Sequence, residues 1–162
     1  MKKHLGFTMI ELVIVLAILV LLAFYAVPKF MSIDKTTRTT EVKSLASTAK
    51  SASEMVRAVV VSKGDLADST VDIEYAGENI AVAVDRGYAK PTKDGIVKAL
   101  DITVQDASTT PETPGDYTVT TTANSITIVP TETKDGANCS VTYKYAATDS
   151  KPVITSTVKD CS

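Results

Sequence analysis

Histidine and cysteine are scarce in this 162-residue chain, which limits the chemistry open to it. The only histidine is His4, and if the residues before Phe7 are removed, as argued below, the remaining protein has no imidazole. That excludes Ser–His and Cys–His nucleophilic pairs and histidine metal sites. The sequence also lacks a phosphate-binding glycine loop and a Cys-x-x-Cys pair. We therefore expect a protein that is not an enzyme and that holds no metal or cofactor.

The chain also lacks an excess of charge of one sign. Charged residues make up 22% of it and the formal net charge is −2, whereas domains that bind nucleic acid are usually basic. A nucleic-acid partner is therefore not expected. Apolar residues are concentrated before residue 28, and the remainder is rich in Thr, Ser, Asp and Lys.

The two cysteines, Cys139 and Cys161, both lie near the C-terminus. An even number of cysteines behind a membrane-targeted N-terminus favours an oxidising compartment and one disulfide. Two reduced, unrelated thiols are the alternative. Closing a loop of this size would contribute on the order of 3 kcal/mol to stability.

Between residues 7 and 27 only Thr8 and Glu11 are plainly polar. About 20 apolar residues cross the hydrocarbon core of a bilayer as a helix, so the run predicts a transmembrane helix. A secretory signal peptide is the alternative, but its apolar region spans roughly 7 to 15 residues and ends at a small-x-small site. Here the run is longer, and Ala26 has bulky Phe24 two positions before it.

Glu11 is the unexpected residue in this run. An ionised carboxylate in the middle of a membrane helix costs roughly 2.5 to 3.5 kcal/mol, and less near the interface. If the chain is cut between Gly6 and Phe7, a new α-amine appears four residues before Glu11. That amine on an incoming subunit could pair with Glu11 of an assembled subunit and fix the register between them. The alternative is an interfacial glutamate that reaches the lipid headgroups.

A short basic leader precedes the apolar run. It reads Lys2-Lys3-His4-Leu5-Gly6 and is followed by Phe7-Thr8-Met9-Ile10-Glu11-Leu12. This string resembles the leader and mature start of type IV pilins. The resemblance implies that residues 1–6 are a leader peptide, that a prepilin peptidase cuts between Gly6 and Phe7, and that Phe7 is N-methylated. Pro28 also lies where pilins carry a proline, which kinks or loosens a helix.

The resemblance implies further partners and two locations. Before assembly the chain would sit in the bacterial inner membrane as a single-pass protein with its N-terminus in the cytoplasm. After assembly by the pilus machinery it would be part of an extracellular homopolymer.

Some later stretches are similar to pilins of the mannose-sensitive haemagglutinin type. This similarity implies a C-terminal loop bounded by the disulfide and a role in surface attachment. The stretches are Ser51-Ala52-Ser53 with the helix end at Val56 to Gly64, Gly87-Tyr88, Gly95-Ile96, Ala99-Leu100-Asp101, and Cys139 to Tyr143 with Cys161.

We expect an α+β fold in which a long N-terminal helix packs on a C-terminal antiparallel β-sheet. The helix would have a hydrophobic half, residues 7–28, and an amphipathic half that opens the globular head, residues 29–162. Gly64 after Lys63 is a typical C-terminal stop, so the helix would cover about 57 residues and roughly 85 Å. The apolar stripe of its second half would be Val42, Leu45, Ala49, Ala52, Met55, Val56 and Val59.

Beyond the helix the patterns predict strands and turns. Alternation on both sides of Gly77-Glu78-Asn79 predicts a hairpin, and Pro91 to Leu100 predicts a loop and a short helix with Asp94 as its cap. Ser108 to Gly115 reads as a surface loop, and Asp135-Gly136 as a turn. The remaining runs predict an antiparallel meander over residues 117–122, 125–129, 139–145 and 153–158.

Clustered carboxylates are the only hint of a metal site. Asp65, Asp68, Asp72 and Glu74 resemble an oxygen-ligand set of the calcium kind, but a solvated acidic face is the simpler interpretation.

The favoured function is therefore structural: a subunit of a type IV pilus, assembled through its helix and used in adhesion. A pseudopilin of a type II secretion system and a minor pilin are alternatives with the same N-terminus. The major pseudopilins lack the terminal cysteine bridge and bind calcium. A monomeric, membrane-anchored binding domain with an uncleaved leader is a third hypothesis.

Overall fold

The computed structural model describes residues 8–64, 69–75, 78–105, 115–133, 136–145 and 151–161. Some predicted features lie outside these ranges. They are the cleavage residues Gly6 and Phe7, the acids Asp65 and Asp68, residues 108–114 of the surface loop, Gly77 of the first turn and Asp135 of the last one.

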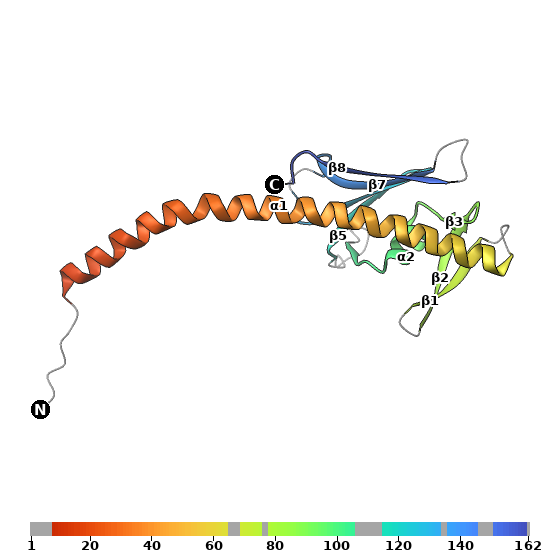
Figure 1. The fold of residues 1–162 in the computed structure, drawn as a ribbon, viewed down its shortest axis with the longest axis horizontal. Coiled ribbons are helices and arrows are strands. Elements are labelled where there is room, and N and C mark those ends of the chain that lie inside the picture. Colours follow the sequence, from red (N-terminus) through yellow and green to blue (C-terminus); the bar gives the residue numbers. More distant parts are fainter. Residues whose placement is uncertain are drawn as a thin grey trace, which may run out of the picture.

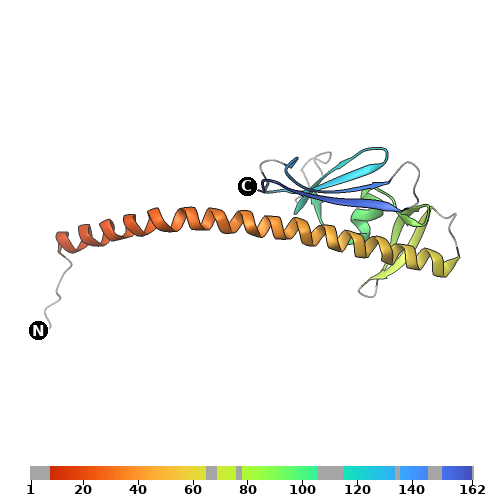
Figure 2. The same ribbon diagram turned by 45° about the horizontal axis from the view of Figure 1, so that its top comes forward.

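One helix, α1 (Met9–Lys63), carries more than a third of the chain. It begins after the N-cap residue Thr8 and ends at Gly64, which has a left-handed φ of 76°. A residue without a Cβ adopts that conformation readily, so the predicted stop is confirmed. The predicted continuous helix is also confirmed, with its start two residues later than expected. The first half of α1 extends away from the rest of the protein, and the C-terminus of the chain lies beside its middle (Figures 1 and 2).

A small sheet follows α1. It contains β1 (Thr70–Tyr75), β2 (Glu78–Asp85) and β3 (Tyr88–Ala89) in that order, all antiparallel. The predicted hairpin is confirmed, but its turn is shorter than expected. Glu78 and Asn79 already belong to β2, where they pair with Tyr75 and Glu74.

The predicted short helix is found as η1 (Lys93–Val97) and α2 (Lys98–Leu100). Asp94 is not its cap, contrary to the prediction. The N-cap residue is Thr92, and Asp94 lies in the first turn. The apolar residues Ile96, Val97 and Leu100 are buried, as a core-facing helix requires.

The second sheet has five strands in sequence order: β4 (Val104–Gln105), β5 (Tyr117–Thr121), β6 (Ser125–Pro130), β7 (Cys139–Tyr145) and β8 (Pro152–Val158). The last four form the predicted antiparallel meander. The two-residue β4 was not predicted, and it pairs parallel to β5. The fold is α+β, with this sheet along one side of α1 and the small sheet nearer the end of the helix (Figures 1 and 2).

The second half of α1 supplies one wall of the core. Its buried positions are spaced by three or four residues: Val42, Leu45, Ala49, Ser53, Val56 and Val60. The predicted stripe was wrong at Met55, which is 56% exposed, and Ser53 and Val60 are buried instead. A helix advances about 100° per residue, so Met55 lies about 100° from Val56 and outside the buried face.

Ser53 is a polar residue that is buried on α1, where its hydroxyl meets that of Tyr143. Its hydroxyl lies 3.3 Å from the Tyr143 hydroxyl, which donates to the Ala89 carbonyl at 2.8 Å. The Tyr145 hydroxyl donates to the same carbonyl at 2.7 Å. These bonds join α1, β7 and β3, so they link the helix and both sheets.

Candidate functional site: the N-terminal half of α1

The first half of α1 has the length and composition of a membrane span. Met9–Val27 has a mean hydropathy of 2.9, and none of it is buried. Its side chains are exposed on every side of the helix, including Ile10 at 68%, Val13 at 60% and Phe24 at 79%. A helix that is apolar all round needs lipid or other helices as neighbours. By length and composition it is the only such helix among the described residues.

Glu11 closes a capping box at the start of this segment. The Thr8 backbone N–H and the Thr8 hydroxyl each donate to Glu11 Oε2, both at 2.9 Å. In return the Glu11 backbone N–H donates to Thr8 Oγ1 at 3.3 Å. These reciprocal bonds satisfy amide groups that have no partner inside the helix.

The sequence interpretation of Glu11 missed this intramolecular role. The signal was available, because Thr8-x-x-Glu11 directly before an apolar run is the pattern of a capping box. The carboxylate also lies in the first turn, where the helix dipole favours a negative charge. In the described part of the chain, its second oxygen, Oε1, accepts no hydrogen bond. Glu11 therefore has one oxygen engaged in its own chain and one available to a partner.

Pro28 marks the end of the apolar segment but does not interrupt the helix. The backbone of α1 continues through it, and the helix curves gently over its length (Figure 1). The idea that Pro28 loosens the helix at this point stays a prediction.

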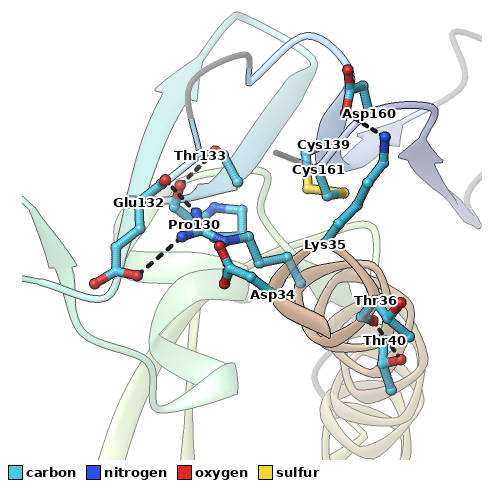
Figure 3. The surroundings of a disulfide bond; sticks show 11 residues. Asp34, Lys35, Thr36, Thr40, Pro130, Glu132, Thr133, Cys139, Asp160 and Cys161 are labelled. Carbon is cyan, nitrogen blue, oxygen red and sulfur yellow. Dashed lines mark hydrogen bonds and ion pairs between the residues drawn. A yellow bond between two sulfur atoms is a disulfide. The ribbon is translucent and has the colours of Figure 1, made fainter. Parts of the chain in front are cut away.

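A short distance after Pro28, α1 makes its first ion pairs with later segments of the chain. Lys35 Nζ lies 2.8 Å from an Asp160 carboxylate oxygen, next to the disulfide (Figure 3). Arg38 contacts Asp34 at 3.2 Å and the Glu132 carboxylate at 3.3 Å, and it also donates to the Glu132 carbonyl. The Arg38 side chain is only 14% exposed, so these contacts are partly shielded from water. Residues 34–38 are thus attached to the chain end after β8 and to the segment after β6.

The two cysteines form the disulfide that the sequence favours. The Cys139 and Cys161 sulfurs are bonded, and both residues are fully buried. The bond connects the start of β7 to the chain end beyond β8 (Figure 3). It closes the last two strands and the intervening connection into a loop, beside Lys35 of α1.

The carboxylates on β1 provide no support for a metal centre. Asp72 and Glu74 are both exposed, on alternate positions of the strand. Within the described ranges, no group of three or more His, Cys, Asp or Glu side chains is placed to hold a metal ion.

Comparison with known proteins identifies the first segment of the chain. Residues 1–27 match the family model of the prokaryotic N-terminal methylation motif. The chain therefore carries a type IV pilin-like prepilin leader, and the motif supports a substrate of the type IV pilin or pseudopilin kind. The match ends where the apolar segment ends. No curated protein and no solved structure matches the chain.

The motif implies processing by a prepilin peptidase and assembly in a pilus-type system. The leader and the single apolar helix are consistent with anchoring in the inner membrane before assembly. The motif belongs to structural rather than catalytic proteins.

Proposed function

We propose that this chain is a structural subunit of a type IV pilus, a homopolymer that is assembled from the inner membrane and used for adhesion. The observation that carries the proposal is the first half of α1. It exposes apolar side chains on every side and bears a single carboxylate in its first turn. Such a surface is stable in lipid, and it is equally stable in a bundle of identical helices.

In this proposal the peptidase cuts between Gly6 and Phe7 and methylates the new N-terminus at Phe7. The resulting amine of an incoming subunit pairs with Glu11 of the subunit already in the filament. The capping box holds the Glu11 carboxylate at a fixed place on the helix through Thr8, and Oε1 is available to the amine. Pairing removes the cost of an isolated charge among apolar helices and fixes the axial register.

The terminal disulfide supports a pilus subunit over the second candidate, a pseudopilin. Cys139 and Cys161 are bonded in the head, whereas the major pseudopilins lack that bridge and bind calcium. A minor pilin would have the same leader, the same apolar helix and the same glutamate. A monomeric, membrane-anchored binding domain would instead keep residues 1–6 and form no filament.

The test is a filament count on cells that express Glu11 variants. Glu11→Gln removes the charge but keeps a side chain that can accept from Thr8, so it should insert in the membrane and yield few or no filaments. Thr8→Val is the matched variant, because it removes the capping hydroxyl and keeps the charge. It should lower helix stability by about 0.5 to 2 kcal/mol and yield more filaments than Glu11→Gln, because the charge that pairs with the amine is kept. Normal filament numbers with Glu11→Gln would contradict the role of the charge in registration.

A further inference from the structure

A pocket of about 290 Å³ lies where the small sheet meets the five-stranded sheet. Its walls come from the β2–β3 turn, from the connection between β3 and η1, and from the β5–β6 turn with the end of β7. The lining includes Asp85, Arg86, Lys90, Thr92, Asn124 and Tyr145. Ligand pockets span roughly 300 to 1000 Å³, so this one suits a small group rather than a long segment. We call it the Arg86 pocket.

Arg86 has a backbone conformation that is unfavourable for an arginine. It is the first of the two residues that connect β2 to β3, where Asp85 pairs with Tyr88, and its φ is 52°. Gly87 follows with a φ of 80°. A hairpin turn with two such residues favours Asn, Asp or Gly at the first position, because a longer side chain is strained there. Strained residues cluster at ligand sites, so this outlier indicates that the Arg86 side chain has a task at the pocket.

Side chains from α1 and β7 hold this turn in place. Arg57 on α1 donates from Nη1 to the Arg86 carbonyl at 3.3 Å, and its guanidinium lies 5.2 Å from the centre of the Tyr88 ring. The Tyr145 hydroxyl on β7 lies 3.1 Å from the Asp85 carbonyl and 3.0 Å from the Tyr88 carbonyl. These contacts use backbone carbonyls and a ring face, so they fix the turn and do not occupy the Arg86 guanidinium.

The other walls of the pocket are also fixed through the backbone. Gly95 approaches the Lys90 carbonyl so closely that a Cβ at Gly95 would lie 2.1 Å from its oxygen. The Ile96 N–H donates to the same carbonyl at 2.9 Å, and the Asn124 carbonyl accepts from the Tyr145 N–H at 2.9 Å. A ligand would therefore meet a pocket whose backbone is already in place, which lowers the cost of binding.

The polar side chains that line the pocket have few partners in the folded chain. Within the described residues, the Lys90 ammonium, the Thr92 hydroxyl and the Asn124 amide make no hydrogen bond or ion pair. The Arg86 guanidinium has only the Asp85 carboxylate, 3.9 Å from its Nε, and at 49% and 47% exposure this pair is weak. Lys90 and Thr92 are half-buried, so their polar groups lose part of their water without gaining a partner. Unused donors from three segments of the chain thus meet at one pocket.

Charge and hydrogen bonding define the ligand. Two positive side chains, Arg86 and Lys90, and one negative side chain, Asp85, leave an excess of one positive charge at the pocket. A single carboxylate matches that excess, and a guanidinium binds a carboxylate through two parallel N–H donors. Thr92, Asn124 and the Asp85 carboxylate can exchange hydrogen bonds with hydroxyl groups beside it. A phosphate dianion would exceed the available positive charge and would be repelled by Asp85.

A sugar ring that bears a carboxylate presents one negative charge and several hydroxyl groups in a small volume. We propose that the Arg86 pocket binds an acidic sugar of the uronic acid kind, with its carboxylate on Arg86 and Lys90. The inference rests on the proposed function, because it names the class of partner for the adhesion assigned to the filament.

The test titrates glucuronate into the full-length chain in detergent and follows the backbone amides of Gly87 and Asn124 by NMR. Two further probes separate the parts of the ligand: the methyl ester of glucuronate keeps the ring without the charge, and acetate keeps the charge without the ring. The main variant is Arg86→Asn, which removes the guanidinium and places a favoured residue in the turn. Lys90→Gln is the second variant, and Lys98→Gln is the control, an exposed lysine on α2 that does not line the pocket.

We expect the wild type and Lys98→Gln to bind glucuronate equally, and more tightly than the ester or acetate. Arg86→Asn and Lys90→Gln should each bind about tenfold more weakly or worse, since each loses a charged donor. Arg86→Asn should at the same time keep or raise the unfolding midpoint, because the strain in the turn is relieved. That combination of retained stability and lost binding is not expected of an arginine that serves the fold alone.

Three results would overturn the inference. They are a wild-type chain whose Gly87 and Asn124 amides do not shift with glucuronate, equal affinity for glucuronate and for acetate or the ester, and wild-type affinity in Arg86→Asn. Filament formation is scored separately on cells that express the same chain. A chain that binds glucuronate in detergent but forms no filaments would contradict the proposed function and support the pocket.

Discussion

The two halves of α1 are built for different surroundings. Over Met9–Val27 the helix is exposed on every side and apolar on every side, so its partners lie outside the chain. Between Val42 and Val60 it buries a residue every three or four positions, and its partners are the strands and helices of the same chain. The helical backbone is continuous between the halves, and the ion pairs at residues 34–38 mark where the head begins to hold it. One helix therefore has two different sets of partners, and we expect that each half can be disturbed without the other.

The largest effect on the head alone should come from removing the disulfide. Cys139→Ser with Cys161→Ser should lower the free energy of unfolding of the head by about 2 to 5 kcal/mol, because the reduced chain gains conformational entropy when it unfolds. Thermal or chemical unfolding of the full chain in detergent, followed by circular dichroism, measures it. Membrane insertion of the first half should not change. An unchanged midpoint would show that the bridge contributes nothing to the head.

The next largest effect should come from a carboxylate placed in the first half of α1. It should reduce insertion of the helix into the membrane. Leu16→Asp should cost roughly 2.5 to 3.5 kcal/mol of membrane insertion and prevent filament formation. Ser47→Asp puts the same group on the exposed side of the second half and should change stability by no more than about 0.5 kcal/mol. Membrane fractionation and filament counts measure the first variant, and an unfolding curve the second. Equal effects at both positions would remove the distinction between the halves.

The smallest effect concerns the tyrosines that connect the second half to the sheets. Burial raises the pKa of Tyr143 from 10.0 to about 12, and burial also raises the pKa of Tyr145. The folded protein therefore binds these protons more tightly than the unfolded chain. The stabilisation is fully present below pH 10, the unfolded pKa, and is lost as the pH rises toward 12.

Tyr143→Phe tests this part of the account. It should cost about 0.5 to 1.5 kcal/mol at neutral pH, because the hydrogen bond to the Ala89 carbonyl is lost while Tyr145 still donates there. It should also make the fall in stability above pH 10 less steep. Unfolding midpoints measured across this pH range check both effects. An alkaline profile identical to that of the wild type would mean that Tyr143 does not titrate with unfolding.

Much of the fold could be predicted from the sequence, and the predictions that failed did so for physical reasons. The C-terminal end of α1, the strand limits of β7 and the pairing of Cys139 with Cys161 followed from a C-terminal glycine, hydrophobic periodicity and the cysteine count. Met55 was misplaced because its apolar side chain was counted with the stripe although its position on the helix lies outside the buried face. β4 is too short to show a strand pattern, and its pairing depends on residues distant in sequence.

The candidate site was predictable in part. The apolar run and Glu11 were evident, but the bond between Glu11 and Thr8 was missed because the glutamate was interpreted as a partner of another subunit or of the lipid headgroups. The cross-strand pairing of threonines in the five-stranded sheet could not be derived from composition. Alternation in each strand indicates which residues share a face, but the alignment of Thr120, Thr127, Thr142 and Thr155 depends on the register between strands.

The most direct test of the central claim is a mass spectrum of the N-terminal peptide from material sheared off cells. The proposed function predicts an abundant chain that begins at N-methylated Phe7, which would demonstrate leader removal and export in a filament together. A chain that still carries residues 1–6 and is found only in membranes would contradict it, and would identify the first half of α1 as a permanent anchor.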